Sequence, residues 1–248
     1  MKEKELVLLL SKDSSFVVEV KKGMLHTKDG IVDLGNLKKK KFGDKIKTHL
    51  GKEFKIVKPT INDILEKKLK RLPQIIMPKD IALILAYTGI SSGSLIVDAG
   101  TGSGFLSIFL ASYAKPKKIV TYENDKRFVK IAKDNIRNSG LSKIVRLKQK
   151  DITKGIDEKN VDLVTLDMKN SEKVVRNAYS VLRLGGYLVV YSPYIEQVIS
   201  VVKEMERKGF SNIKTVENIV REWQVEKFTR PKTVGLMHTG FLTFARKV

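Results

Sequence analysis

The spacing of apolar residues changes near position 73 and divides the chain into two parts. Before it, the apolar residues stand in short runs, and residues 16–20 and 54–57 are rich in the β-branched and aromatic types that favour strands. Residues 24–34 hold Asp29 and Gly30 between apolar neighbours, which predicts a tight hairpin. The first part of the chain therefore predicts a small β domain.

A lysine run and a helix complete this first part. Residues 38–41 are all lysines and predict a solvated loop. Residues 61–72 have helical spacing, with Thr60 placed to cap the helix and Pro73 placed to end it. We therefore assign residues 1–72 to a small N-terminal β domain with a helical linker, and residues 73–248 to a second domain.

The second domain alternates strands and helices along the chain. Strands are predicted at residues 94–99, 118–122, 144–147, 161–166 and 186–191. Helices, the earliest with Pro78 in its first turn, are predicted at 78–87, 105–113, 125–138, 171–182 and 195–208. Residues 213–225 and 235–245 predict two strands with no helix between them. The order predicts an α/β, Rossmann-like fold with a seven-stranded, mostly parallel sheet whose final pair is antiparallel.

The loop after the first of these strands carries the strongest local signal. It follows a buried strand, opens a helix and reads Asp98, Ala99, Gly100, Thr101, Gly102, Ser103, Gly104. Glycines there allow a tight turn and a close approach of a ligand to the backbone. The dinucleotide fingerprint would need glycine where Phe105 stands, and the Asp98 carboxylate is badly placed beside a pyrophosphate. The loop instead suits a cofactor with a cationic amino-acid end, and we expect S-adenosylmethionine.

Acidic residues follow the next two strands. Glu123 stands just past the second strand, where its carboxylate can accept hydrogen bonds from both ribose hydroxyls of the cofactor. Asp151 follows the third strand and can accept one from the adenine amino group, or can cap its own loop. Phe105 and Phe128 can flank the cofactor, and core packing is the alternative role of each.

Asp167 follows the fourth strand and faces the same edge of the sheet, between cofactor and substrate. We assign it to cofactor binding and to catalysis. Enzymes that methylate the exocyclic amine of DNA adenine commonly have Asp or Asn, two prolines and an aromatic residue at this place. Here Met168, Lys169 and Asn170 follow the aspartate. Chemistry on an exocyclic amine is therefore not indicated.

Charge and composition limit the classes of partner that the protein is expected to bind. The chain has 48 basic and 27 acidic residues, and its net charge of +21 attracts polyanions. Nucleic acid is the first candidate and an acidic membrane surface the weaker one, and a lysine-rich surface without a partner is the alternative. The absence of cysteine excludes disulfides and thiolate chemistry, and with three histidines we expect no metal site. The longest apolar runs are too short to span a bilayer, so we expect a cytoplasmic protein with no membrane partner.

Four stretches of the chain match a known family. They are residues 74–80 (QIIMPKD), the glycine loop within residues 97–105, Tyr122 and Glu123 with Asn135, and Arg230–Pro231 with residues 238–242 (HTGFL). With the small N-terminal β domain, they make the chain similar to the tRNA adenine-N1 methyltransferases that act on adenosine 58 of the T-loop, in particular their archaeal and bacterial homo-oligomeric branch. The resemblance covers nearly the whole chain, and its first and last stretches are the more specific ones.

The resemblance implies a class I methyltransferase fold, methyl transfer to N1 of adenine 58 in tRNA, with position 57 left open as a second target, and a homotetramer. Transfer leaves the base positively charged, and Asp167 is our candidate to stabilise that charge and to hold the amino group. Met77 stands where the family often has tyrosine. Met77, Tyr194 and His238 are the residues expected near the substrate, and a structural role is the alternative for Tyr194 and His238.

Two other functions compete with this one. A methyltransferase for a small molecule, such as a corrin ring, or for a protein isoaspartyl group would use the same glycine loop, but it does not account for the net charge or the N-terminal β domain. A non-catalytic RNA-binding subunit with a vestigial fold is the other alternative. The intact loop glycines and the acidic residues Glu123, Asp151 and Asp167 argue against it.

Overall fold

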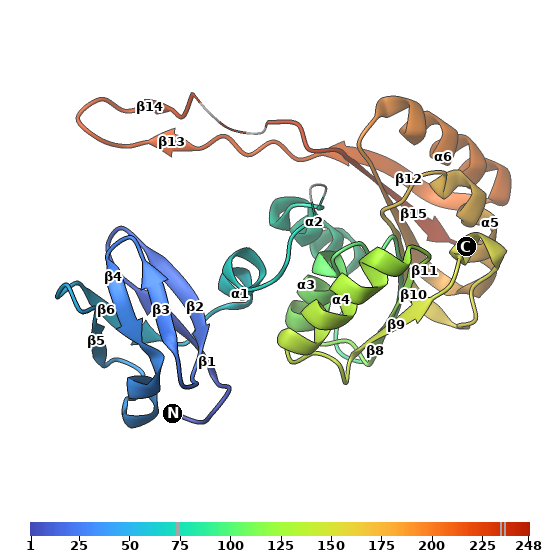
Figure 1. The fold of residues 1–248 in the computed structure, drawn as a ribbon. Helices are drawn as coiled ribbons and strands as arrows, with labels where there is room; N and C mark the ends of the chain where they lie inside the picture. Colours follow the sequence, from blue (N-terminus) through green and yellow to red (C-terminus); the bar gives the residue numbers. More distant parts are fainter. Residues whose placement is uncertain (73–74, 234, 236) are drawn as a thin grey trace. The chain divides into compact units, whose positions relative to one another are not determined.

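The computed structural model describes residues 1–72, 75–233, 235 and 237–248. The chain forms two compact units, Met1–Leu69 and Lys70–Val248, which are drawn in Figure 1. Pro73, which was expected to end a helix, and Gln74, which belongs to one of the family stretches, lie outside the described residues. Within the described ranges, no helix combines the length and the apolar character needed to cross a membrane.

The N-terminal unit is built on an antiparallel sheet in the order β2-β1-β6-β5. Its strands are β1 (Leu6–Leu10), β2 (Ser15–Glu19), β5 (Lys45–Lys47) and β6 (Glu53–Val57). The predicted hairpin is confirmed as β3 (Met24–Thr27) paired with β4 (Gly30–Asp33). Leu9, Phe54 and Ile56 belong to the buried cluster that forms the core of this unit.

Helix α1 (Ile61–Lys67) begins as predicted but ends before residue 72. The Thr60 hydroxyl accepts from the Asp63 amide, and the Asp63 carboxylate accepts from the Thr60 amide, so the start is a capping box. Beyond the helix, the Lys70 amide donates to the Asn135 side chain at 3.0 Å, and the Lys70 carbonyl accepts from it at 2.9 Å. These bonds hold the backbone of Lys70 outside the helical pattern.

The C-terminal unit contains one seven-stranded sheet in the order β12-β15-β11-β10-β7-β8-β9. Its strands are β7 (Leu95–Ala99), β8 (Lys118–Glu123), β9 (Val145–Gln149), β10 (Val161–Leu166), β11 (Leu182–Ser192), β12 (Phe210–Glu217) and β15 (Phe241–Lys247). The neighbouring strands β11, β10, β7, β8 and β9 pair in parallel, whereas β15 is antiparallel to both β11 and β12. The predicted seven-stranded, mostly parallel sheet is confirmed.

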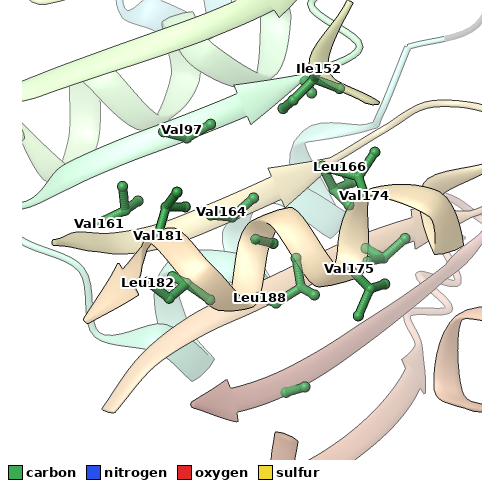
Figure 2. Close-up of a cluster of buried hydrophobic side chains, with 14 of the residues drawn as sticks. Val97, Ile152, Val161, Val164, Leu166, Val174, Val175, Val181, Leu182 and Leu188 are labelled. Atoms are coloured by element: carbon green, nitrogen blue, oxygen red, sulfur yellow. The ribbon is translucent and has the colours of Figure 1, made fainter. Parts of the chain in front are cut away.

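Helices pack on the faces of this sheet. They are α2 (Pro78–Thr88), α3 (Phe105–Ala114), α4 (Lys126–Asn138), α5 (Val175–Val181) and α6 (Ile195–Lys208). Figure 2 shows the core beside α5, a cluster of buried side chains that includes Val97, Val164 and Leu188 of three strands and Val175 of the helix. Successive residues of a strand point to opposite faces, so Asp98, the neighbour of Val97, points toward α3, where its carboxylate meets a serine hydroxyl.

Two predicted elements have a different type or extent. The helix predicted at residues 171–182 is a 3-10 turn at Ser171–Val174 followed by α5, and Leu182 already begins β11. Part of the lysine run lies in a 3-10 helix, Leu34–Lys39, rather than in a loop. That turn forms because the Asp33 carboxylate accepts a hydrogen bond from the second amide beyond it. Strands β1 and β5 had not been predicted.

The last two predicted strands are interrupted by an arm. The arm comprises residues 218–240, of which 234 and 236 lie outside the described residues, and Figure 1 shows it extending from the ends of β12 and β15. Within it, β13 (Trp223–Gln224) pairs with β14 (Arg230–Pro231) as a separate two-stranded ladder. The prediction of two continuous strands at residues 213–225 and 235–245 was therefore wrong. Asn218 and Thr239, where the arm leaves the two strands, instead form hydrogen bonds with Lys79 and Asp80 of α2.

Candidate active site

Glu123 is held rigidly at the end of β8. One of its carboxylate oxygens accepts from the Gly102 amide at 2.9 Å, and the other accepts from the amides of Asn124 and Asp125 at 2.9 and 3.0 Å. The Glu123 residue is only 7% exposed. The carboxylate can accept about four hydrogen bonds and makes three, so it keeps about one acceptor position for a ligand. The three hydrogen bonds give the side chain one fixed orientation. Its bond to the ribose hydroxyls stays a prediction.

Asp98 lies beneath the glycine loop. Its carboxylate accepts hydrogen bonds from three hydroxyls, those of Ser107 at 2.6 Å, Thr121 at 2.7 Å and Thr165 at 2.8 Å. Burial raises the pKa of Asp98, and the three hydrogen bonds oppose that rise. The carboxylate thus ties β7, β8, β10 and α3 together under the loop. A direct contact of Asp98 with a cofactor stays a prediction.

Gly100 brings the loop against the end of β10. Its φ of +82° lies in the left-handed region, and a Cβ at this position would stand 1.9 Å from the Asp167 carbonyl oxygen. The Asp167 amide also donates to the Ala99 carbonyl at 2.8 Å. Only glycine fits this approach, so the loop and the catalytic candidate Asp167 form one contiguous site.

The rest of the loop opens helix α3. Gly104 precedes the helix, and the Ser103 carbonyl accepts a hydrogen bond from the Asn135 amide group at 2.8 Å. The Ser103 hydroxyl is buried, and no hydrogen-bond partner is found for it in the described part of the chain. A buried hydroxyl without a partner is costly unless a ligand supplies one. Ser103 therefore marks a place where a polar ligand group is expected.

Three further predicted cofactor residues lie around the loop. Phe105 is 4% exposed and has the Arg71 guanidinium 5.7 Å from its ring centroid. Phe128 is partly buried on α4. Asp151 accepts hydrogen bonds from the amide and the hydroxyl of Thr153 at 2.9 and 2.7 Å. Both bonds lower the pKa of Asp151, and the bond from the hydroxyl has the larger effect. Core packing of Phe105 and a capping role of Asp151 are thus present, and their cofactor contacts stay predictions.

Asp167 opens into a cavity of about 460 Å³. The cavity is lined by Arg71, Leu72, Ile75, Ile76, Met77, Asp167, Tyr191, Pro193, His238 and Thr239. Burial raises the pKa of Asp167 to about 7, and the negative charge of Asp98 adds to the rise. The cavity therefore joins an apolar wall to a carboxyl group that titrates near neutral pH, which is typical of a ligand-binding site.

Tyr191 takes the place in the cavity that we expected for Tyr194. Tyr194 lies on the surface and is 62% exposed, whereas Tyr191 at the end of β11 lines the cavity beside Asp167. The Tyr191 hydroxyl donates to the Thr239 carbonyl. Burial, with the charges of Asp80 and Asp167, raises the pKa of Tyr191 to about 12, so the phenol stays neutral. Its place at the carboxyl end of the strand beside β10 is the sequence signal that could have identified it.

His238 lies at the rim of the cavity. One ring nitrogen, Nδ1, lies 2.5 Å from Glu217 Oε1, and the other, Nε2, lies 3.2 Å from the Pro193 carbonyl oxygen. Both neighbours are acceptors, so the arrangement favours the doubly protonated imidazolium, and the hydrogen bond to Glu217 raises the pKa of His238. Met77 lines the cavity as well and is the residue that precedes α2.

Comparison with known proteins gives concordant matches. A family model described as the tRNA methyltransferase complex GCD14 subunit matches residues 54–234. A tRNA (adenine(57)-N(1)/adenine(58)-N(1))-methyltransferase TrmI of Methanocaldococcus jannaschii is 37% identical over 245 residues, covering 88% of this chain and 86% of that protein. The tRNA (adenine(58)-N(1))-methyltransferase TrmI of Thermus thermophilus is 30% identical, covering 98% and 96%.

Two solved structures resemble the whole chain. The structure of a SAM-dependent O-methyltransferase from Thermotoga maritima matches with a TM-score of 0.91 and 33% identity, covering all of this chain and 94% of that one. The structure of tRNA (m1A58) methyltransferase TrmI from Aquifex aeolicus matches with a TM-score of 0.84 and 25% identity, covering all of this chain and 98% of that one.

Proposed function

Because the chain belongs to the family of tRNA methyltransferase complex GCD14 subunits, we propose that it transfers a methyl group from S-adenosylmethionine to N1 of an adenine in tRNA. The target we propose is adenine 58, the position named in the Methanocaldococcus and Thermus relatives; the former's name adds position 57. One observation in the site carries the proposal: Asp167, whose pKa is about 7, borders both the glycine loop and a cavity.

The residues around the loop fit this cofactor. The unpartnered hydroxyl of Ser103 offers a hydrogen bond to a polar group, and the fixed carboxylate of Glu123 offers acceptors for hydroxyls. Gly102 has a φ of +55°, and a Cβ there would have only ordinary contacts, so the backbone is open at that point. S-adenosylmethionine, when bound, supplies an electrophilic methyl group carried on a positively charged sulfur.

Asp167 is the residue we assign to the chemistry. Methylation at N1 leaves the adenine ring positively charged, and an ionised carboxylate beside the ring stabilises that charge as it develops. The same carboxylate can accept a hydrogen bond from the adenine amino group and so orient N1. Tyr191 remains a neutral phenol on the cavity wall, where it shapes the space for the base. The target base must leave the tRNA fold to reach this depth.

The proposal includes the location of the protein and its assembly. With tRNA as its substrate, we propose that the protein acts in the cytoplasm and works there as a homotetramer. Support for assembly comes from the arm, where half or more of the surface of several large apolar residues is exposed: Ile219, Val220, Trp223, Val225 and Phe228. Such a surface is normally covered by a partner. Light scattering should give the mass of four chains, and a monomer mass would contradict the assembly.

Product analysis tests the proposed reaction. The purified protein is incubated with unmodified tRNA and methyl-labelled S-adenosylmethionine, and the tRNA is digested to nucleosides. Label in N1-methyladenosine is the expected result. Label in a ribose O-methyl nucleoside would overturn the choice of atom, a contrast worth making because one whole-chain structural match is named an O-methyltransferase. Cofactor binding by calorimetry without any labelled tRNA would favour a small-molecule substrate, and no binding would favour a non-catalytic subunit.

A further inference from the structure

A buried ion pair stands at the start of α2, outside the groups assigned to the reaction. Lys79 Nζ lies 2.8 Å from Asp80 Oδ1, and the two side chains are 17% and 1% exposed. Removing both charges from water is costly, and an ion pair this deep is stable only when further hydrogen bonds satisfy it. The partners that supply those bonds show what the pair holds.

Those partners are the two roots of the arm. Asp80 Oδ2 accepts from the Thr239 hydroxyl at 2.7 Å, and Lys79 Nζ donates to the same hydroxyl at 2.7 Å and to the Asn218 carbonyl. The Asn218 side chain in turn donates to the Lys79 carbonyl at 2.8 Å. Asn218 directly follows β12, and Thr239 comes two residues before β15. One ion pair thus fixes both points at which the arm leaves the sheet.

The same contacts reach the cavity. Thr239 lines the cavity, and its carbonyl accepts the hydrogen bond of the Tyr191 hydroxyl. The next residue, Gly240, lies so close to the Tyr191 ring that an added Cβ would stand 2.5 Å from it. On the other side, Met77 is the cavity residue that immediately precedes α2. The position of Tyr191 beside Asp167 therefore depends on where Thr239 is held.

We propose that Lys79 and Asp80 are positioning residues that clamp Thr239, and through it Tyr191, so that the cavity keeps the shape required by the incoming adenine. The proposal rests on the proposed function for its reaction, but the clamp itself is a property of the chain. Neither residue touches the reacting atoms. The clamp links the arm to the cavity, so a loosened arm root and a slower reaction should occur together.

Thr239→Val tests the clamp with little change of shape. Valine removes the hydroxyl that donates to Asp80 and accepts from Lys79, and so removes both bonds between the ion pair and this root of the arm. We expect turnover of tRNA to fall at least about tenfold, as small displacements at a reacting centre do, while the dissociation constant of S-adenosylmethionine measured by calorimetry stays unchanged. Thr239→Ser restores the hydroxyl and should recover most of the lost turnover. Thr88→Val is the matched control, because within the described residues its hydroxyl bonds only to the Ile84 carbonyl of the same helix.

Amide hydrogen exchange at the arm roots tests the clamp independently of the reaction. Exchange of the paired backbone beside the roots, Thr215–Glu217 of β12 and Phe241–Thr243 of β15, should be at least about fivefold faster in Thr239→Val, because the loss of even one ordinary hydrogen bond changes a local opening equilibrium by about that factor. Asn218→Ala removes a different bond of the clamp and gives the same readout if Thr239→Val fails to fold. Unchanged exchange, or equal turnover in Thr239→Val and Thr239→Ser, would overturn the clamp. A wild-type protein that binds cofactor but does not methylate tRNA would overturn the proposed function and leave the exchange result standing.

Discussion

At the residue scale, the proposed methyl transfer depends on the ionisation of Asp167. Its place after the fourth strand could be predicted from the sequence, because carboxyl ends of parallel strands share one edge of the sheet. Its pKa of about 7 could not, because the rise comes from burial and from the charge of Asp98, which reaches the site from another strand. Tyr191 is a different case, because it stands at the carboxyl end of a predicted strand and its place in the cavity could have been predicted. Tyr194, three residues later, lies on the surface.

The raised pKa predicts the direction of the pH dependence. The ionised form of Asp167 stabilises a cationic base. Because burial raises the pKa of Asp167 to about 7, the neutral form predominates below that pH. The value of kcat/KM for tRNA should therefore rise with pH, reach half its maximum near pH 7 and level off about one pH unit above that. The measurement is initial rates from pH 5 to 9 at constant ionic strength.

His238→Asn serves as the control for this profile, because His238 is a second titratable group at the cavity and its hydrogen bond to Glu217 raises its pKa. The rising limb should persist in that variant. A profile that is flat in the wild type, or a limb that disappears only in His238→Asn, would assign the titration to a group other than Asp167.

At the element scale, the elements with strong local signals were predicted well. Helix α6 and strand β10 have the predicted bounds, since their apolar spacing and the Gly209 stop are local properties of the sequence. The arm was missed for the opposite reason. Its roots form hydrogen bonds with Lys79 and Asp80, which are about 140 to 160 residues away in the chain. Contacts at such a separation cannot be predicted from the local spacing of apolar residues.

The glycine loop gives a prediction about one element. Gly100→Ala places a Cβ against the Asp167 carbonyl at 1.9 Å and imposes a side chain on a positive φ. Gly140→Ala, after α4, imposes a side chain on a similar φ of +76° but meets nothing within 4 Å. We expect Gly140→Ala to lower the free energy of unfolding by about 1–2 kcal/mol, and Gly100→Ala to lower it further and to abolish cofactor binding.

Urea unfolding and calorimetry with S-adenosylmethionine measure the two effects. Equal losses of stability with intact cofactor binding in Gly100→Ala would show that the loop does not need its close contact with Asp167. The comparison isolates the clash because both variants carry the same change at a left-handed position.

At the scale of the whole molecule, the net charge of +21 follows directly from the sequence and needs no structure. Lysine and arginine side chains that contact phosphates release counterions, so the affinity for tRNA should fall steeply as salt rises from 50 to 200 mM, by roughly a thousandfold if six phosphates are contacted. Filter binding or fluorescence titration measures this. An affinity for tRNA that does not change over this range would contradict the assignment of the surplus charge to RNA binding.

The most direct measurement maps the methylated position in tRNA by primer extension, because a methyl group on N1 of adenine blocks base pairing and stops reverse transcriptase. After incubation with the wild-type protein and S-adenosylmethionine, an unmodified tRNA should give a new stop at adenine 58, and Asp167→Ala should give almost none at equal protein concentration while keeping its fold by circular dichroism. A wild-type reaction without that stop, or a stop of equal strength with Asp167→Ala, would contradict the central claim that this carboxylate directs methyl transfer to N1 of a tRNA adenine.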